Sequence, residues 1–139
     1  MPVFQDKEEQ EDGLLHFSLP GLLPDGQTLV VNPTMRTAIL LAHEASNGAS
    51  VLAQHVFSPN GMRVLVPLLQ AYPDYCPYEV LLSTLFPLSI DQCRKLLREA
   101  WDLSVRPVRR AIANIVVGFH SFGLKVYSLR GLGYILRPV

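Results

Sequence analysis

Side chains that could contact an anion gather in the last third of the chain. Residues 94–139 carry nine Lys and Arg against two acids, although the whole chain of 139 residues has a formal net charge of zero. Residues 1–12 carry five acids against one lysine, and residues 13–93 carry five acids against two arginines. This asymmetry indicates an anionic partner for the basic third. The alternative is a solvated surface that is basic without binding anything.

Other chemistry has little support in the residue types. Two cysteines, Cys76 and Cys93, are too few for a disulfide framework, and the four histidines have no zinc-ligand spacing. Cys76 precedes Pro77 at an expected helix start, where a thiol pKa could be lowered, but packing is the commoner role of such a cysteine. The glycines of "LRGLGYILRPV" lack the spacing of a phosphate-binding loop. We therefore expect no enzyme, no metal and no cofactor.

Length and composition are those of one folded domain. Hydrophobic residues make up 49% and charged residues 17% of the chain. No apolar run reaches the ~20 residues of a membrane span, and the N-terminus lacks a secretory signal. These features predict a soluble cytoplasmic protein. Residues 1–13 are expected to be a disordered acidic arm, and residues 14–139 a single domain.

Residues 14–57 are expected to form an N-terminal sheet. Two β-branched runs, residues 28–31 and 37–41, flank the turn-forming "NPTM", which predicts a hairpin. A helix over Met35–Ala45 is the alternative, because this segment contains good helix formers. "SNGAS", residues 46–50, predicts a further turn, and residues 51–57 a third strand. Whether residues 14–27 join this sheet stays open.

Residues 58–122 are expected to be helical. Ser58 and Pro59 can start a first helix, which Pro67 should kink or delay. A second helix starts at Pro77, and the pair Ser89 and Gln92 is a capping box for a third. The third helix would carry the apolar stripe Ile90, Cys93, Leu96, Leu97, Ala100 and Trp101. A fourth, within residues 104–123, would bury Val108, Ile112, Ile115 and Phe119 and end at Gly123.

Residues 123–139 are expected to form a β-hairpin. Gly131 and Gly133 would allow backbone angles that a side chain forbids, and residues 134–136 would return the strand to the core. Lys125, Arg130 and Arg137 would then face phosphate. A sheet, three to four helices and a basic hairpin together predict an α+β fold, a winged helix-turn-helix whose hairpin is the wing.

The chain resembles the OmpR/PhoB-type winged-helix DNA-binding domain of response regulators over roughly residues 27–137. "VYSLRGLGYIL" is similar to the R-G-x-G-Y wing of that family, and "LVVNPTMRTAILL" to its N-terminal hairpin. "VFSPNGMRVLVPLLQAYPDYCPYEVLL" resembles the first and second helices of the family. "VRPVRRAIANIVVGF" resembles its recognition helix, with matches at Arg106, Val108 and Ile112. The resemblance implies sequence-specific binding of double-stranded DNA and transcription regulation, with a homodimer on repeated half-sites.

Departures from the family pattern fall on the first and the recognition helices. Gly61 stands at an acidic position, and Arg109 and Ala111 replace an Asp and a His. Later basic positions of the recognition helix fall on Asn114, Val116 and Val117, so the helix is largely apolar. We expect Arg109 and Arg110, near the helix start, to contribute most of any base contacts. The full set of candidate DNA contacts is Arg106, Arg109, Arg110, Asn114, Lys125, Ser128 and Arg130.

The segment between the second and recognition helices is long enough for an extra helix. In some family members this loop contacts RNA polymerase, which implies RNA polymerase or another protein as a possible partner of residues 88–104. Backbone or partner contacts are expected from Arg94, Lys95, Arg98 and Arg137, with a solvated helix face as the alternative. Trp101 is expected to pack against helices rather than stack on a base. The chain has no room for a receiver domain, so we expect a standalone module.

A protein-interaction module is the alternative to DNA binding. Val116, Val117, Phe119 and Phe122 would form its exposed apolar patch. Burial of Val116 and Val117 favours a well-packed DNA-binding helix, whereas their exposure favours a partner or dimer contact.

Overall fold

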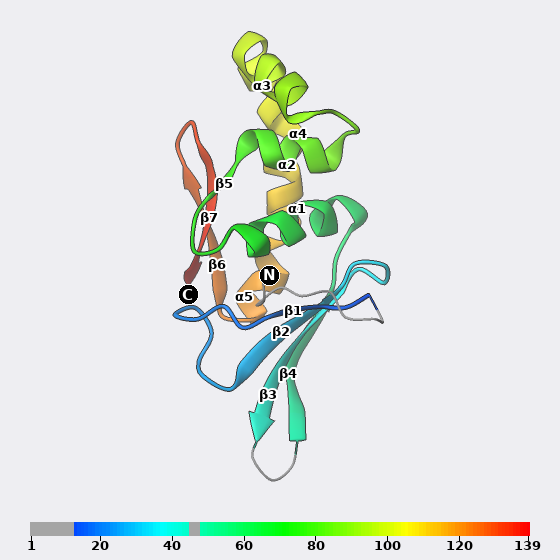
Figure 1. Cartoon of the computed structure of the whole chain (residues 1–139), viewed down its shortest axis with the longest axis vertical. Helices are drawn as coiled ribbons and strands as arrows, with labels where there is room; N and C mark the ends of the chain where they lie inside the picture. Colours follow the sequence, from blue (N-terminus) through cyan, green and yellow to red (C-terminus); the bar gives the residue numbers. More distant parts are fainter. Residues whose placement is uncertain (1–12, 45–47) are drawn as a thin grey trace, which may run out of the picture.

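A computed structural model describes residues 13–44 and 48–139, and it contains an antiparallel sheet, a set of helices and a C-terminal hairpin (Figure 1). The first sheet has the order β1-β2-β3-β4, and a smaller sheet has the order β5-β7-β6. The predicted mixed α+β class with a C-terminal hairpin is confirmed. The predicted arm lies outside the described residues except for Gly13.

The four-stranded sheet contains β1 (Leu15–Phe17), β2 (Gln27–Asn32), β3 (Thr37–Glu44) and β4 (Gly48–Val56). The predicted hairpin is confirmed, because β2 pairs with β3 from Asn32 and Thr37 onward, and the helical alternative for residues 35–45 is wrong. β1 pairs with β2, so the segment before residue 27 joins the sheet. The turn predicted at 46–50 is wrong for residues 48–50, because β4 begins at Gly48. Residues 45–47 lie outside the described part of the chain.

Helix α1 (Pro59–Ala71) begins where its capping residues place it. The Ser58 hydroxyl accepts a hydrogen bond from the Gly61 amide at 3.0 Å, and Pro59 occupies the first turn. Pro67 does not delay the start, because the helix continues through it with Leu65 and Leu68 buried on either side. A Cβ on Gly61 would lie 3.2 Å from the Ile115 side chain. The small residue at this position therefore lets α1 pack closely against the segment after α4.

Three further helices and a short one complete the helical part: α2 (Tyr78–Leu85), α3 (Ile90–Glu99), α4 (Trp101–Ala113) and α5 (Val116–Ser121). The capping box of α3 is confirmed, with the Ser89 hydroxyl and the Gln92 side chain each accepting from the other residue's backbone amide. Helices α1, α2 and α4 contact one another, and α3 packs on α2 and α4 at the outer end (Figure 1).

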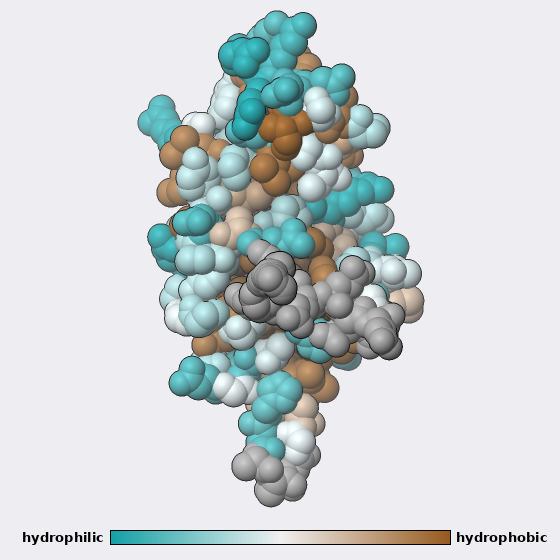
Figure 2. Space-filling model, viewed as in Figure 1, coloured by the Kyte–Doolittle hydropathy of each residue, from teal (hydrophilic) through white to brown (hydrophobic). Residues whose placement is uncertain are grey.

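The apolar stripe predicted for α3 is only partly buried: Ile90, Leu97, Ala100 and Trp101 are half-buried, and Leu97 and Trp101 pack against the core. Cys93 alone among the helical residues of that stripe is buried, while Leu96 is 40% exposed. The reason is position: α3 lies at the edge of the helical part, where only its inner edge meets α2 and α4. Figure 2 shows hydrophilic side chains gathered over this outer end of the molecule.

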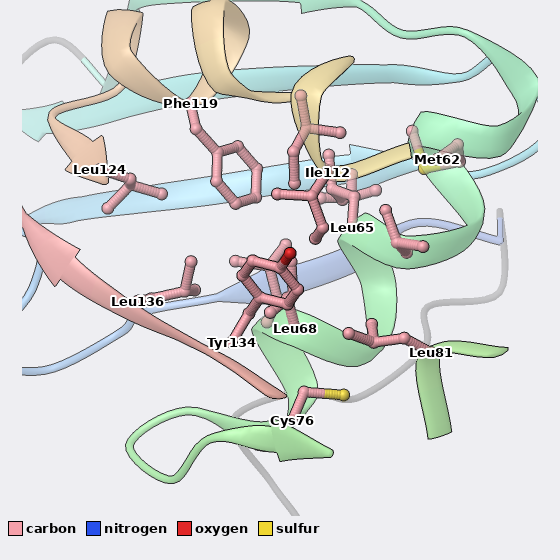
Figure 3. Close-up of a cluster of buried hydrophobic side chains, with 14 of the residues drawn as sticks. Met62, Leu65, Leu68, Cys76, Leu81, Ile112, Phe119, Leu124, Tyr134 and Leu136 are labelled. Carbon is pink, nitrogen blue, oxygen red and sulfur yellow. The ribbon is translucent and has the colours of Figure 1, made fainter. Parts of the chain in front are cut away.

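The core connects the helices to both sheets. Leu65 and Leu68 of α1, Ile112 of α4 and Phe119 of α5 converge on the hairpin, as Figure 3 shows. From the hairpin come Leu124, Tyr134 and Leu136, which belong to β6 (Leu124–Leu129) and β7 (Gly133–Pro138). The predicted inward set of the fourth helix, Val108, Ile112, Ile115 and Phe119, is buried. No helix in the described part of the chain is long and apolar enough to cross a membrane.

The two glycines of the hairpin serve different purposes. Gly131 has φ +76°, a left-handed conformation that glycine adopts without strain, as expected. Gly133 has no positive φ, so the expectation for this residue is wrong. A Cβ on Gly133 would overlap the Cys76 carbonyl and lie 2.9 Å from the Pro77 Cα. Gly133 is needed because β7 passes against the backbone of β5 (Cys76–Pro77).

We predict that Gly133→Ala destabilises the protein by about 1–3 kcal/mol, the usual cost of overpacking, because the added methyl meets backbone atoms that cannot rotate away. Urea unfolding followed by circular dichroism measures the change. Leu132→Ala is the control, since Leu132 is half exposed and its truncation should cost less than about 0.5 kcal/mol. Equal stability of the two variants would contradict the close approach.

Candidate nucleic-acid interface

Three arginines of α4 occupy one exposed side of the helix. Arg106, Arg109 and Arg110 are exposed, whereas Val108 and Ala111 between and beside them are buried. Residues three and four apart share a helix face, so the three guanidinium groups form one stripe. Asp102 lies one turn before Arg106 on the same side and is exposed as well. We call Arg106, Arg109 and Arg110 the arginine stripe.

Helix α4 starts earlier than expected. It begins at Trp101, so only Ala100 separates it from the end of α3 at Glu99. The Trp101 ring packs edge-on against Tyr78 with centroids 5.1 Å apart, and the Ser104 hydroxyl donates to the Leu96 carbonyl. These contacts anchor the first turn. Arg109 and Arg110 therefore lie in the C-terminal half of α4, and their expected place near the helix start is wrong.

The predicted single helix over residues 104–123 is broken. Helix α4 ends at Ala113, and the tight turn at Asn114 and Ile115 separates it from α5. The run Ile115–Val117 is β-branched and therefore a poor continuation of a helix. The break also lets Ile115 be fully buried. Asn114 is exposed at the C-cap of α4, next to the arginine stripe in sequence but outside the helix proper.

Helix α5 packs on the N-terminal sheet through Gly118. A Cβ there would lie 2.6 Å from both the His55 and Phe57 rings, so only glycine permits this approach. The apolar patch proposed for this region is half correct. Val116 and Val117 are 46% and 74% exposed, but Phe119 and Phe122 are buried. The two valines are thus the exposed apolar residues of α5.

The hairpin divides its polar side chains between two faces. Lys125 pairs with Arg137 and Tyr127 with Ile135, so these residues share one face, which we call the outer face. Lys125, Tyr127 and Arg137 are exposed there, whereas Ile135 is buried. Lys125 lies over the Tyr127 ring, with its Nζ 5.1 Å from the ring centroid. Ser128 pairs with Tyr134 and shares its face, which is turned toward the helices. Arg130 is exposed in the turn between the strands. The predicted phosphate contacts Lys125 and Arg137 therefore lie together, and Ser128 lies apart from them.

Arg109 connects the arginine stripe to the hairpin through Tyr134. The Tyr134 ring packs on Tyr78 of α2, with centroids 5.5 Å apart. Burial and the hydrogen bond with Tyr78 raise the pKa of Tyr134, while the nearby Arg109 charge opposes the rise. The phenol of Tyr134 is therefore neutral at physiological pH, and through it β7 lies near both α2 and the arginine stripe.

The basic residues of α3 differ in their freedom to bind. Arg94 lies 3.4 Å from both Glu79 and Asp91, so its charge is already partnered. This makes Arg94 a weak candidate for a backbone or partner contact. Lys95 and Arg98 are exposed, and no ion pair among the described residues involves them. Trp101 packs on Tyr78 and is partly buried, which agrees with the expected packing role.

The two thiols are buried and protonated. Burial, followed by the charge of Glu79, raises the pKa of Cys76 to about 12, and the same causes raise the pKa of Cys93. The lowered thiol pKa considered for Cys76 is therefore wrong in direction, because burial outweighs any effect of the helix start. No group of three metal-ligating side chains occurs among the described residues.

Two aromatic residues of the interface were missing from the candidates. Tyr127 is 43% exposed beside Lys125, and Tyr134 contacts the arginine stripe. The alternation of exposed and buried residues along the hairpin could have placed both, since neighbouring residues of a strand point to opposite faces.

The raised pKa of Cys76 predicts a loss of stability at alkaline pH. The unfolded chain releases this thiol proton above about pH 9, whereas the folded protein keeps it until about pH 12. Stability is therefore fully present below pH 9 and should fall by up to about 1.4 kcal/mol per pH unit between pH 9 and 12. Urea midpoints measured across this range test the decline. Cys76→Ala should decline less steeply, and an equal slope would contradict the assignment.

The cross-strand pair Lys125 and Arg137 predicts that Arg137→Glu stabilises the hairpin. Like charges directly opposite each other on a sheet repel, and an opposite pair instead contributes roughly 0.2–1 kcal/mol. The free energy of unfolding in urea at low salt should rise by this amount. Arg130→Glu changes the charge equally but falls outside the strand register, so it should leave stability unchanged. A loss of stability in Arg137→Glu would show that the two charges do not repel.

Comparison with protein-family models, with curated protein sequences and with solved structures finds no match to this chain.

Proposed function

We propose that the protein binds double-stranded DNA as a winged helix and regulates transcription. Helix α4 is the recognition helix, α2 is the helix that packs across it, and the hairpin β6–β7 is the wing. Mutual packing of α1, α2 and α4, followed by the basic hairpin, supports this assignment. Helix α3 is an addition between the two helices of the helix-turn-helix.

The observation that carries the proposal is the exposed arginine stripe beside the wing. Arg106, Arg109 and Arg110 are exposed on α4, and among the described residues no carboxylate forms an ion pair with them. Arg109 also adjoins Tyr134 of β7. A helix that presents three unpaired guanidinium groups next to a basic hairpin fits the phosphate density and the guanine edges of a DNA groove.

The break at Asn114 removes the main objection to DNA binding. In the sequence, the residues after Ala113 make the recognition helix unusually apolar. In the structure they belong to α5, which packs on β4. The exposed side of α4 is then polar and basic, apart from Leu103 and Ala113. The reading surface is therefore shorter than in the family that the sequence resembles.

Roles within the interface follow from position and reach. Arg109 and Arg110, in the last turns of α4, are the candidates for base edges, and Asn114 at the C-cap is a candidate for adenine. Lys125, Arg130 and Arg137 on the hairpin are candidates for phosphate, which fixes orientation without reading sequence. Ser128 is exposed but lies on the opposite face of the hairpin from Lys125 and Arg137, which makes it a weaker candidate. A homodimer on repeated half-sites is the corresponding assembly.

The second candidate function is a protein-interaction module. The exposure of Val116 and Val117 favours it, because two neighbouring exposed valines on a short helix suit a protein contact. This surface belongs to α5 and is separate from the arginine stripe. A partner of α5, or RNA polymerase at the exposed Lys95 and Arg98 of α3, is therefore compatible with DNA binding through α4.

We predict that the protein binds a fluorescein-labelled duplex of random sequence, with an affinity that falls steeply as salt rises. Fluorescence anisotropy between 50 and 300 mM salt measures this dependence. Arg109→Ala/Arg110→Ala should weaken binding at least about tenfold at 50 mM salt and lower the salt slope by about 1–2, because each lost phosphate contact removes about one released counterion.

The charge-matched control is Lys95→Ala/Arg98→Ala on α3, which removes the same net charge and should change affinity much less. Circular dichroism checks that both double variants remain folded. Equal losses in the two variants would mean that only net charge attracts the duplex. An absence of binding at 50 mM salt overturns the proposal, and the valine surface of α5 then becomes the leading candidate.

A further inference from the structure

A groove lies between the β2–β3 turn and helix α1, and no residue of the arginine stripe lines it. Its volume is about 470 Å³, which is within the range of pockets that bind ligands. Apolar walls come from Met62, Val66 and prolines of the turn and of α1. Polar groups at its edge come from Thr34, Gln70 and Thr84.

The two arginines of this groove are unusual for their region. Arg36 and Arg63 are the only Lys or Arg between residues 13 and 93, and both line the groove. They lie 27 positions apart in the sequence, one in the β2–β3 turn and one on α1, and the fold brings them to the same opening. A region that is otherwise net acidic thus places all of its fixed positive charge at one site.

Neither arginine is neutralised by a carboxylate within the described residues, where Arg94 accounts for the ion pairs. The Arg36 Nε donates to the Phe57 carbonyl at 3.2 Å, and its backbone adopts a left-handed φ of 59° that non-glycine residues rarely use. Arg63 donates to the Asn60 side-chain oxygen at 2.7 Å. Both guanidinium groups keep further N–H donors for an anion.

The start of the described chain lies beside this groove. Leu15 pairs with Val31, so the chain before β1 runs toward Pro33, which lines the groove. Figure 1 shows the start of β1 next to the β2–β3 turn. The twelve residues before Gly13 include Asp6, Glu8, Glu9, Glu11 and Asp12. Eight extended residues span up to about 26 Å, which is enough to cross the groove.

We propose that the groove is a docking site for the acidic segment at residues 5–12 of the same chain, with Arg36 and Arg63 binding its carboxylates. Charge complementarity and the point of attachment both favour this occupant. The segment is tethered at the edge of the groove, so its effective concentration there is high. A contact that is weak between separate molecules is therefore well populated within one chain. This contact is independent of the proposed DNA interface.

The test compares the full chain with a full-length variant in which the five acids become amides: Asp6→Asn, Glu8→Gln, Glu9→Gln, Glu11→Gln and Asp12→Asn. In ¹H–¹⁵N NMR spectra at 50 mM salt, the amides of Thr34, Met62 and Val66 should shift between the two proteins. These shifts should shrink as salt is raised to 0.5 M, because ions screen exposed charges.

A synthetic peptide of residues 1–13, added to the neutralised protein, should restore the shifts at the groove. Arg63→Gln in that protein should weaken peptide binding about tenfold, as expected for the loss of a charged hydrogen-bonding partner. Arg98→Gln on α3 is the matched control and should leave binding unchanged. Arg63 is preferred to Arg36 because, within the described residues, its side chain bonds an exposed neighbour on its own helix, whereas Arg36 bonds the backbone of a distant segment.

Three results would overturn the proposal. These are identical groove amides in the two full-length proteins, shifts that fall on α4 and the hairpin instead of the groove, and peptide binding by Arg63→Gln that is as tight as by Arg98→Gln. The second result would place the acidic segment on the arginine stripe. None of these readouts depends on DNA, so failure here is distinguishable from failure of the proposed function.

Discussion

The approach of Gly133 to the backbone of Cys76 and Pro77 is the contact on which the rest of the interface depends. It fixes β7 against β5, and β5 leads directly into α2. Once β7 is fixed there, its next residue, Tyr134, packs against Tyr78 and lies near Arg109. The position of the hairpin relative to the arginine stripe therefore follows from a missing side chain at one residue.

The turn at Asn114 and Ile115 has a comparable effect on the other end of α4. It redirects the chain so that Ile115 and Phe119 are buried, while Gly118 brings α5 onto the rings of His55 and Phe57. The N-terminal sheet is thereby joined to the helical part. The same turn limits the exposed side of α4 to its arginines and a few neighbours. The turn at Asn114 and Ile115 thus determines both which of these residues enter the core and which side chains α4 exposes.

Charge is distributed over two separate surfaces. The arginine stripe and the hairpin carry six of the nine basic residues of the last third, and the other three lie on α3. Arg36 and Arg63 form a second, smaller site at the groove by α1. Unpaired cations on one surface repel one another, as Lys125 and Arg137 do across the hairpin. An anion bound at either surface would reduce this repulsion. The formal charge of zero conceals this arrangement because the acids lie in other segments.

The sequence by itself determined the features that depend on neighbouring residues. Ser58 with Pro59 starts α1, Ser89 with Gln92 caps α3, and the turn before Thr37 joins two strands, because capping and turn geometry involve only a few consecutive residues. The basic character of the last third was equally visible. The mixed α+β class followed from these local signals and from their order along the chain.

Only the tertiary structure decided the features that depend on residues far apart in sequence. The packing of α5 on the N-terminal sheet depends on Gly118 meeting His55 and Phe57, and the role of Gly133 depends on β5, more than fifty residues earlier. The partial burial of the α3 stripe depends on how much of it α2 and α4 can cover, and the pairing of Arg94 with Glu79 depends on α2. Periodicity shows which residues share a face, but the elements that pack against that face determine whether it is buried.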